Sequence, residues 1–359
     1  MSKTINNNQQ QTLVKLNDLG LLNDNVINKT VNSEEGSPWF IKVFFGFTGI
    51  LSSLFFIGFL SLLLFEFSFF DSFIGLVVVG ALLSAAGWFL FSNARTRHSP
   101  FWNSLAFAIT LAGQMYIGFA LLFEGYDSPI SVLLLLLVQL IVTIVIPNFI
   151  YRLLSATVAL GCIVYLSSYY GFSEMSLALL ALIAIVAQLQ RYSILQRLPS
   201  RWRANFAEML SAIGYASAFV LLSVSVYFIA AEYGYGRGGY QETITYNYYL
   251  AQGLMTLASL YAVYLIIKRY EISLLSATGL IIVGATAVLG IMSIYVSGLL
   301  ATSLIIVIAF ANSQRVLLGF GILALVSYIF WYYYQLDTSL LLKSASMLII
   351  GVGLMLIRW

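Results

Sequence analysis

Hydrophobic positions after residue 39 fall into long runs that charged residues, Pro, Gly or Asn separate from one another. A bilayer core about 30 Å thick is crossed by a helix of about 20 apolar residues. The runs therefore predict an all-α fold, a polytopic transmembrane bundle of about twelve helices. The predicted spans are Phe40–Phe65, Phe73–Phe91, Trp102–Phe123, Ile130–Ile146, Leu153–Tyr169, Met175–Leu189, Phe206–Ala230, Tyr248–Ile267, Ile272–Met292, Val296–Phe310, Val316–Tyr333 and Thr338–Ile357.

Two of the apolar stretches are too long for one span. Ile130–Tyr169 and Ile272–Phe310 each continue for about 40 residues with weak interruptions, twice what one crossing requires. Each stretch is predicted to hold two helices joined by a tight turn. Pro147-Asn148 supplies the first turn and the Ser293–Gly298 region the second, because Pro ends a helix and Gly favours turns.

The positive charges predict how the bundle is oriented. Lys and Arg concentrate on the cytoplasmic side of short membrane-protein loops. With the N-terminus inside, fifteen of the 17 lysines and arginines lie on the inner side of the twelve spans, and only Arg237 and Lys343 lie outside. Both termini are therefore predicted to be cytoplasmic.

The chain divides into a polar head, residues 1–39, and the bundle, residues 40–359. Apolar residues of the head recur at spacings of three and four, which predicts one or two short amphipathic helices. Two interpretations stay open for this segment: a cap that lies against the inner face of the bundle, or a docking site for a cytoplasmic partner.

Composition narrows the possible functions. Hydrophobic residues make up 61% of the chain and charged residues 9%, against about 25% charged in soluble proteins. A single Cys (Cys162) and a single His exclude an internal disulfide and the common zinc sites. No Ser-x-x-Lys, His-Glu-x-x-His or paired-carboxylate pattern of a common hydrolase is present. We expect no catalysis, no metal, no cofactor and no nucleic-acid partner.

Polar residues inside predicted spans are costly to insert and often mark a transport path. Here most are amides, and no Asp or Glu lies clearly at mid-membrane, which argues against a carrier driven by protons or sodium. The amides have two interpretations: hydrogen bonds between helices, or the lining of a path. They are Gln114, Gln139, Asn148, Gln188 and Gln252.

A polar stripe marks the last predicted span. Ser339, Lys343 and Ser346 are spaced i, i+4 and i+7, so they share one helix face. Asp337 precedes the helix as a candidate N-cap. Lys343 is expected either to snorkel towards the outer interface or to face the bundle as a functional cation.

The two ends of the chain resemble a bacterial family of inner-membrane proteins, domain-of-unknown-function family 4401. The resemblance rests on SPWFIKVFFGFTGILSSLFFIGFLSLLL (Ser37–Leu64) and on the tail Ala311–Trp359, with Asn312 and Arg315 near an inner helix end, a YYY cluster and LDTSLLLKS. It implies a multi-pass protein of the bacterial inner membrane. It also implies a membrane-anchored partner with a GDYxxLxY motif, which this chain lacks.

Two functional hypotheses follow. In the first, the protein is a non-catalytic subunit that works with an envelope or membrane partner. In the second, it is a transporter or flippase for an anionic or amphipathic substrate, with a path lined by the amides and Lys343. The first accounts better for the missing mid-membrane carboxylates.

The orientation can be tested with a reporter enzyme that is active only outside the cytoplasm. Fused after Arg203, it should be inactive, because four arginines place this loop inside. Fusion within Ala231–Tyr249, the predicted outer loop, is the positive control. Activity after Arg203 would refute the twelve-span topology.

Overall fold

Helices form all of the regular structure in the part of the chain that the computed structural model describes, residues 39–64, 72–92, 100–124, 128–234, 247–273, 275–295, 298–335 and 344. The helices are α3 Trp39–Leu64, α4 Phe73–Ser92, α6 Pro100–Glu124, α7 Pro129–Val145, α8 Phe149–Tyr169, α9 Ser173–Leu189, α10 Arg191–Gln196, α11 Ser200–Gly234, α12 Tyr248–Arg269, α13 Ala277–Tyr295, α14 Leu299–Ala311 and α15 Arg315–Gln335.

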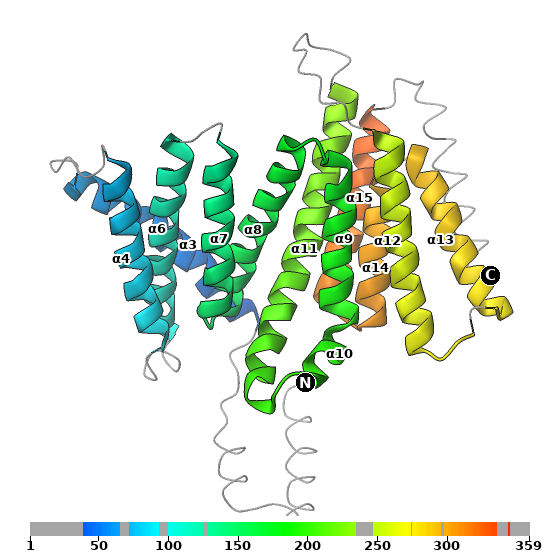
Figure 1. Ribbon diagram of the computed structural model, residues 1–359, viewed down its shortest axis with the longest axis horizontal. Helices are drawn as coiled ribbons and strands as arrows, with labels where there is room; N and C mark the ends of the chain where they lie inside the picture. The colour runs from blue at the N-terminus through cyan, green and yellow to red at the C-terminus, as the bar shows by residue number, and fades with distance from the viewer. Residues whose placement is uncertain are drawn as a thin grey trace, which may run out of the picture.

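The helices stand side by side in an elongated row, with α4 and α6 at one end and α13 at the other (Figure 1). At the first end, α6 packs closely on both α3 and α4. In the middle, α8 packs on α7 and α11, and α9 packs on α11 and α12. Alternating directions place the α7–α8 turn, α10 and the start of α11 at the same end of the bundle (Figure 1).

Eleven of the twelve predicted spans coincide with a helix. The twelfth, Thr338–Ile357, and the predicted head, apart from Trp39, lie outside the described residues. The structure adds the short helix α10, and it begins α13 at Ala277 instead of Ile272. At 35 residues, α11 is about 52 Å long and so extends well beyond a bilayer core of about 30 Å.

The helices have the length and the surface of membrane helices. Five of those described are long and apolar enough to cross a membrane, and six shorter apolar helices accompany them. Large apolar side chains point outwards along them: Phe55 is 78% exposed, Leu62 79% and Phe310 79%. A soluble protein rarely exposes contiguous apolar surface on this scale, which favours a membrane protein.

A tight turn separates α7 from α8, as predicted. Pro147 has no backbone N–H to continue a helix, and the chain leaves the helical conformation at Ile146. Asn148 then caps α8, its side-chain oxygen accepting a hydrogen bond from the backbone N–H of Tyr151 at 3.1 Å. The second predicted turn is also present, since Gly298 adopts φ +81° ahead of α14, a conformation that Gly adopts readily.

Small residues bring α4 and α6 into unusually close contact. A methyl group added at Gly80 would lie 2.7 Å from the carbonyl oxygen of Gly113, and one added at Gly113 would lie 2.5 Å from Oγ of Ser84. Only glycine fits such spacing, which is the usual way that membrane helices approach one another. The helices α3, α4 and α6 therefore form a tightly packed group at one end of the row.

Arg152, near the start of α8, is fully buried. Its Nε donates a hydrogen bond at 2.8 Å to the carbonyl oxygen of Ile146, which also accepts one from the backbone N–H of Asn148 at 3.0 Å. Its Nη1 donates to the carbonyl oxygen of Asn205 at 3.2 Å and lies 3.4 Å from a carboxylate oxygen of Glu208, and its Nη2 donates to Oδ1 of Asn205. One guanidinium thus joins the α7–α8 turn to α11.

Arg152→Met should lower the free energy of unfolding in mild detergent by about 2 kcal/mol, because it removes the hydrogen bonds that a buried guanidinium makes to the α7–α8 turn and to α11. The ion pair adds little to this value, because Glu208 is 43% exposed. Arg197→Met, at an exposed arginine, is the matched control and should change stability little. Equal thermal stability of the two variants would contradict the role given to Arg152.

Candidate ligand-binding cavity

Two of the predicted amide side chains form a hydrogen bond between helices α6 and α7. Gln139 of α7 donates a hydrogen bond from Nε2 to Oε1 of Gln114 of α6 at 2.9 Å. Gln114 is 7% exposed and Gln139 5%. Both lie near the middle of their helices, so the pair forms a polar point deep inside otherwise apolar packing.

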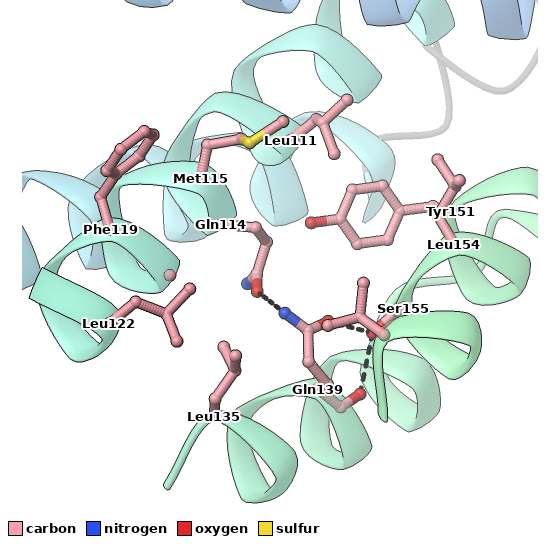
Figure 2. Close-up of a pocket in the computed structure, with 12 residues that line it drawn as sticks. Leu111, Gln114, Met115, Phe119, Leu122, Leu135, Gln139, Tyr151, Leu154 and Ser155 are labelled. Carbon is pink, nitrogen blue, oxygen red and sulfur yellow. Dashed lines mark hydrogen bonds between the residues drawn. The ribbon is translucent and has the colours of Figure 1, made fainter. Parts of the chain in front are cut away.

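Side chains of α8 extend this polar point. Ser155 donates to Oε1 of Gln139 at 2.6 Å. On the neighbouring turn, the Tyr151 hydroxyl donates to the backbone carbonyl of Thr110 at 3.2 Å. Figure 2 shows Gln114, Gln139, Ser155 and Tyr151 converging on one space from three helices.

That space is a cavity of about 690 Å³, called here the α6–α8 cavity. Its volume is within the range of small-molecule sites, which are mostly apolar with a few placed polar groups. The lining matches this description. It consists of Leu111, Gln114, Met115, Gly118, Phe119, Leu122, Leu135, Gln139, Tyr151, Leu154, Ser155 and Val158.

The cavity opens through the side of the bundle. All of its lining residues belong to helices and none to a connecting segment. Its rim carries exposed apolar side chains: Phe119 is 56% exposed, Leu122 45% and Val158 43%. Gly118 borders open space, since a methyl group added there would meet no atom within 4 Å. In a bilayer, such an opening would face the acyl chains.

Apolar clusters close the cavity towards both ends of the helices. One cluster contains Phe107, Ile146 and Tyr151, beside the α7–α8 turn, and the Phe107 and Tyr151 rings meet edge to face at 5.7 Å. The other contains Leu121 and Leu135, near the opposite end. The side opening is therefore the broadest approach that these contacts leave.

The electrostatic character of the cavity is neutral. None of the described residues that line it carries a charge. The nearby Arg152 directs its hydrogen bonds towards Ile146 and α11. An amide nitrogen carries two hydrogens, and Nε2 of Gln139 uses one of them, on Gln114. Within the described part of the chain, its second hydrogen is available to an acceptor.

A second group of predicted residues meets where α9, α12 and α14 end. Gln314 donates from Nε2 to Oε1 of Gln188 at 2.8 Å, and Asn312 donates to the backbone carbonyl of Gln188 at 3.1 Å. Arg269 donates to Oδ1 of Asn312 at 2.9 Å, whereas Arg315 is exposed at the start of α15.

Buried Nε2 of Gln188 and Oε1 of Gln314 have no hydrogen-bond partner among the described residues. The amide of Gln188 lies directly against Gly214, where even an added methyl group would collide with it. The Gln188–Gln314 pair therefore has no open space on the side that faces Gly214. It contrasts with the α6–α8 cavity, where the polar groups border open space.

The other predicted amides in the described part of the chain lie outside the cavity lining. Gln252 accepts a hydrogen bond from Oγ of Ser293 at 2.9 Å and so links α12 to α13. Asn148 caps α8 and donates to Oδ1 of Asn103 at 3.2 Å. The stripe on the last predicted span lies outside the described residues; it comprises Asp337, Ser339, Lys343 and Ser346. Within the described residues, no group of His, Cys, Asp and Glu could hold a metal ion.

Sequence reasoning singled out Gln114 and Gln139 but missed Tyr151, Ser155 and Gly118. A signal was present for α8, because Tyr151, Ser155 and Val158 recur at i, i+4 and i+7, the spacing of one helix face. Gly118 carried no such signal. Its importance depends on the open space beside it, which is a property of the packed helices.

Comparison with known protein families gives a match over most of the chain. The family model described as "Domain of unknown function (DUF4401)" matches residues 38–359. No match was found among curated proteins or among solved structures. The match begins at residue 38, one residue into the first segment that carries the sequence resemblance, and continues through the α6–α8 cavity to the second segment. The chain therefore belongs to the DUF4401 family.

Proposed function

We propose that the protein is a multi-pass protein of the bacterial inner membrane that takes up an amphipathic molecule in the α6–α8 cavity and acts as its transporter or flippase. The observation that carries the proposal is the buried Gln114–Gln139 pair at the edge of a sizeable, laterally open cavity. No catalytic step is part of this proposal.

The position of the amide pair supports transport over a purely structural role. A hydrogen-bonded amide pair can simply join two helices, as Gln252 and Ser293 do in α12 and α13. Gln114 and Gln139 differ from that pair because they line a space large enough for a ligand. Apolar clusters above and below this space resemble the closed sides that a carrier needs around a central site.

The chemistry of the lining narrows the two substrate classes that the sequence left open. An anion buried without a positive partner is strongly destabilised, and no cation lines the cavity among the described residues. An amphipathic molecule satisfies both parts of the lining, its apolar portion against the leucines and Phe119 and its polar group against the amides. We therefore favour the amphipathic substrate for this cavity.

We retain the partner hypothesis as a second proposal, which rests on what the sequence resemblance implies. A transporter and a partner-bound subunit are compatible, because the GDYxxLxY protein would occupy another surface. The predicted outer loop between α11 and α12 is the candidate contact, and most of it lies outside the described residues.

The transport proposal is tested in liposomes that contain the purified full chain and a fluorescent lipid labelled on its acyl chain. Glucosylceramide tests an uncharged headgroup, phosphatidylcholine a zwitterionic one and phosphatidylglycerol the anionic kind that the lining disfavours, and external dithionite reports movement between leaflets. At least one probe should move several times faster than in protein-free liposomes. Gly118→Phe should reduce that rate about ten-fold or more, because the ring would occupy the cavity.

Gly161→Phe is the matched control, because Gly161 also borders open space but lies on α8 outside the lining. It should leave the rate unchanged. Transport by Gly118→Phe at the wild-type rate, or no movement of any probe by the wild-type protein, would contradict the proposal.

The partner proposal is tested by affinity purification from native membranes in mild detergent. A membrane-anchored protein with a GDYxxLxY motif should copurify in a constant ratio to the chain and should appear by mass spectrometry. Recovery of the chain alone would count against this proposal and would leave the transport proposal intact.

A further inference from the structure

The lining of the α6–α8 cavity also restricts what kind of polar group its occupant can carry. We infer that the cavity takes a lipid-like molecule whose polar group is uncharged and bears a hydrogen-bond acceptor such as an ester carbonyl, and that this molecule enters sideways from the bilayer. The inference rests on the proposed function and names the substrate class of that same site.

The first step concerns the hydrogen bond that the cavity can offer. Nε2 of Gln139 has one hydrogen on Gln114 and a second available. Nε2 of Gln114 makes one long contact, 3.5 Å to Oγ of Ser84, and has a second hydrogen as well. Oε1 of Gln139 accepts a hydrogen bond from Ser155, and Oε1 of Gln114 accepts one from Gln139, so each oxygen has one lone pair left. The cavity therefore offers donors to an incoming acceptor.

The second step concerns charge. Side chains at the polar point are 5–7% exposed, so a group bound there loses most of its water. A neutral carbonyl recovers that loss with one or two hydrogen bonds. A phosphate or carboxylate would need a positive partner, and Arg152 already makes its hydrogen bonds to Ile146 and to Asn205 and Glu208 of α11.

The third step concerns access. Phe119, Leu122 and Val158 present exposed apolar surface at the rim, which suits the chain of a lipid. The two apolar clusters lie between the polar point and the ends of the helices. A lipid that arrives from the bilayer contacts only apolar side chains before it reaches the polar point. A water-soluble ligand would have to leave water and pass the same apolar side chains, which is unfavourable.

Two lipids with the same chains and different polar groups provide the test. Dioctanoylglycerol is uncharged and carries ester carbonyls, and dioctanoylphosphatidic acid adds only an anionic phosphate. Binding of each radiolabelled lipid to the purified full chain in mild detergent is measured by scintillation proximity. Dioctanoylglycerol should bind saturably and at least ten-fold more tightly than the phosphatidic acid.

Two pairs of variants locate the binding. Gly118→Leu should weaken dioctanoylglycerol binding at least ten-fold by filling the cavity, whereas Gly161→Leu, in open space outside the lining, should not. Gln139→Leu should weaken it about five-fold, the effect of one lost hydrogen bond. Gln252→Leu removes an equally buried amide elsewhere and should have no effect.

Gly118→Leu keeps the amide pair, so it tests the site even where Gln139→Leu proves unstable. Equal affinity for the two lipids, or unchanged binding in Gly118→Leu, would overturn the inference. If dioctanoylglycerol does not bind while Gly118→Phe still blocks lipid movement, the inferred ligand class is wrong and the transport proposal is unaffected. If dioctanoylglycerol binds as expected but no lipid moves between leaflets, the transport proposal is wrong and the ligand class is unaffected.

Discussion

The buried guanidinium of Arg152 is the constraint on which the arrangement of the N-terminal half depends. It donates a hydrogen bond to the Ile146 carbonyl in the α7–α8 turn, and it joins α8 to Asn205 and Glu208 of α11. Its neighbours on α8, Tyr151 and Ser155, bind α6 and α7 instead, through hydrogen bonds to Thr110 and Gln139. The buried charge therefore fixes α8 at the turn, beside the neutral polar groups that border the cavity.

The α6–α8 cavity lies at the boundary between two differently packed parts of the row. On one side, glycines let α6 approach α4 to backbone contact. On the other, α6 meets α7 and α8 through the two apolar clusters and three hydrogen bonds in the described residues, which join Asn103 to Asn148, Thr110 to Tyr151 and Gln114 to Gln139. The looser packing at this boundary leaves room for a ligand. The boundary is also the place where the α3–α4–α6 group could move relative to α7 and α8.

Much of the fold could be predicted because it depends on local properties. Apolar run length determined the helices, and Pro147 and Gly298 marked turns inside two long runs. Pairing between helices could not be predicted, because it depends on shape complementarity between segments distant in the chain. Gln114 and Gln139 were therefore recognised as unusual, but not as partners. Likewise, Arg152 gave no sign of complete burial, since its partners at Asn205 and Glu208 lie on another helix.

Spin-label accessibility at position 118 tests most directly whether the cavity opens to the bilayer. After Cys162→Ala removes the single natural cysteine, a nitroxide attached to Gly118→Cys in liposomes reports its collisions with oxygen, which concentrates in the bilayer, and with a water-soluble nickel chelate. Strong oxygen access, weak nickel access and slower nitroxide motion when dioctanoylglycerol is added are the expected results. Nickel access equal to that of a label on the α9–α10 segment, with no response to the lipid, would contradict a laterally open lipid site.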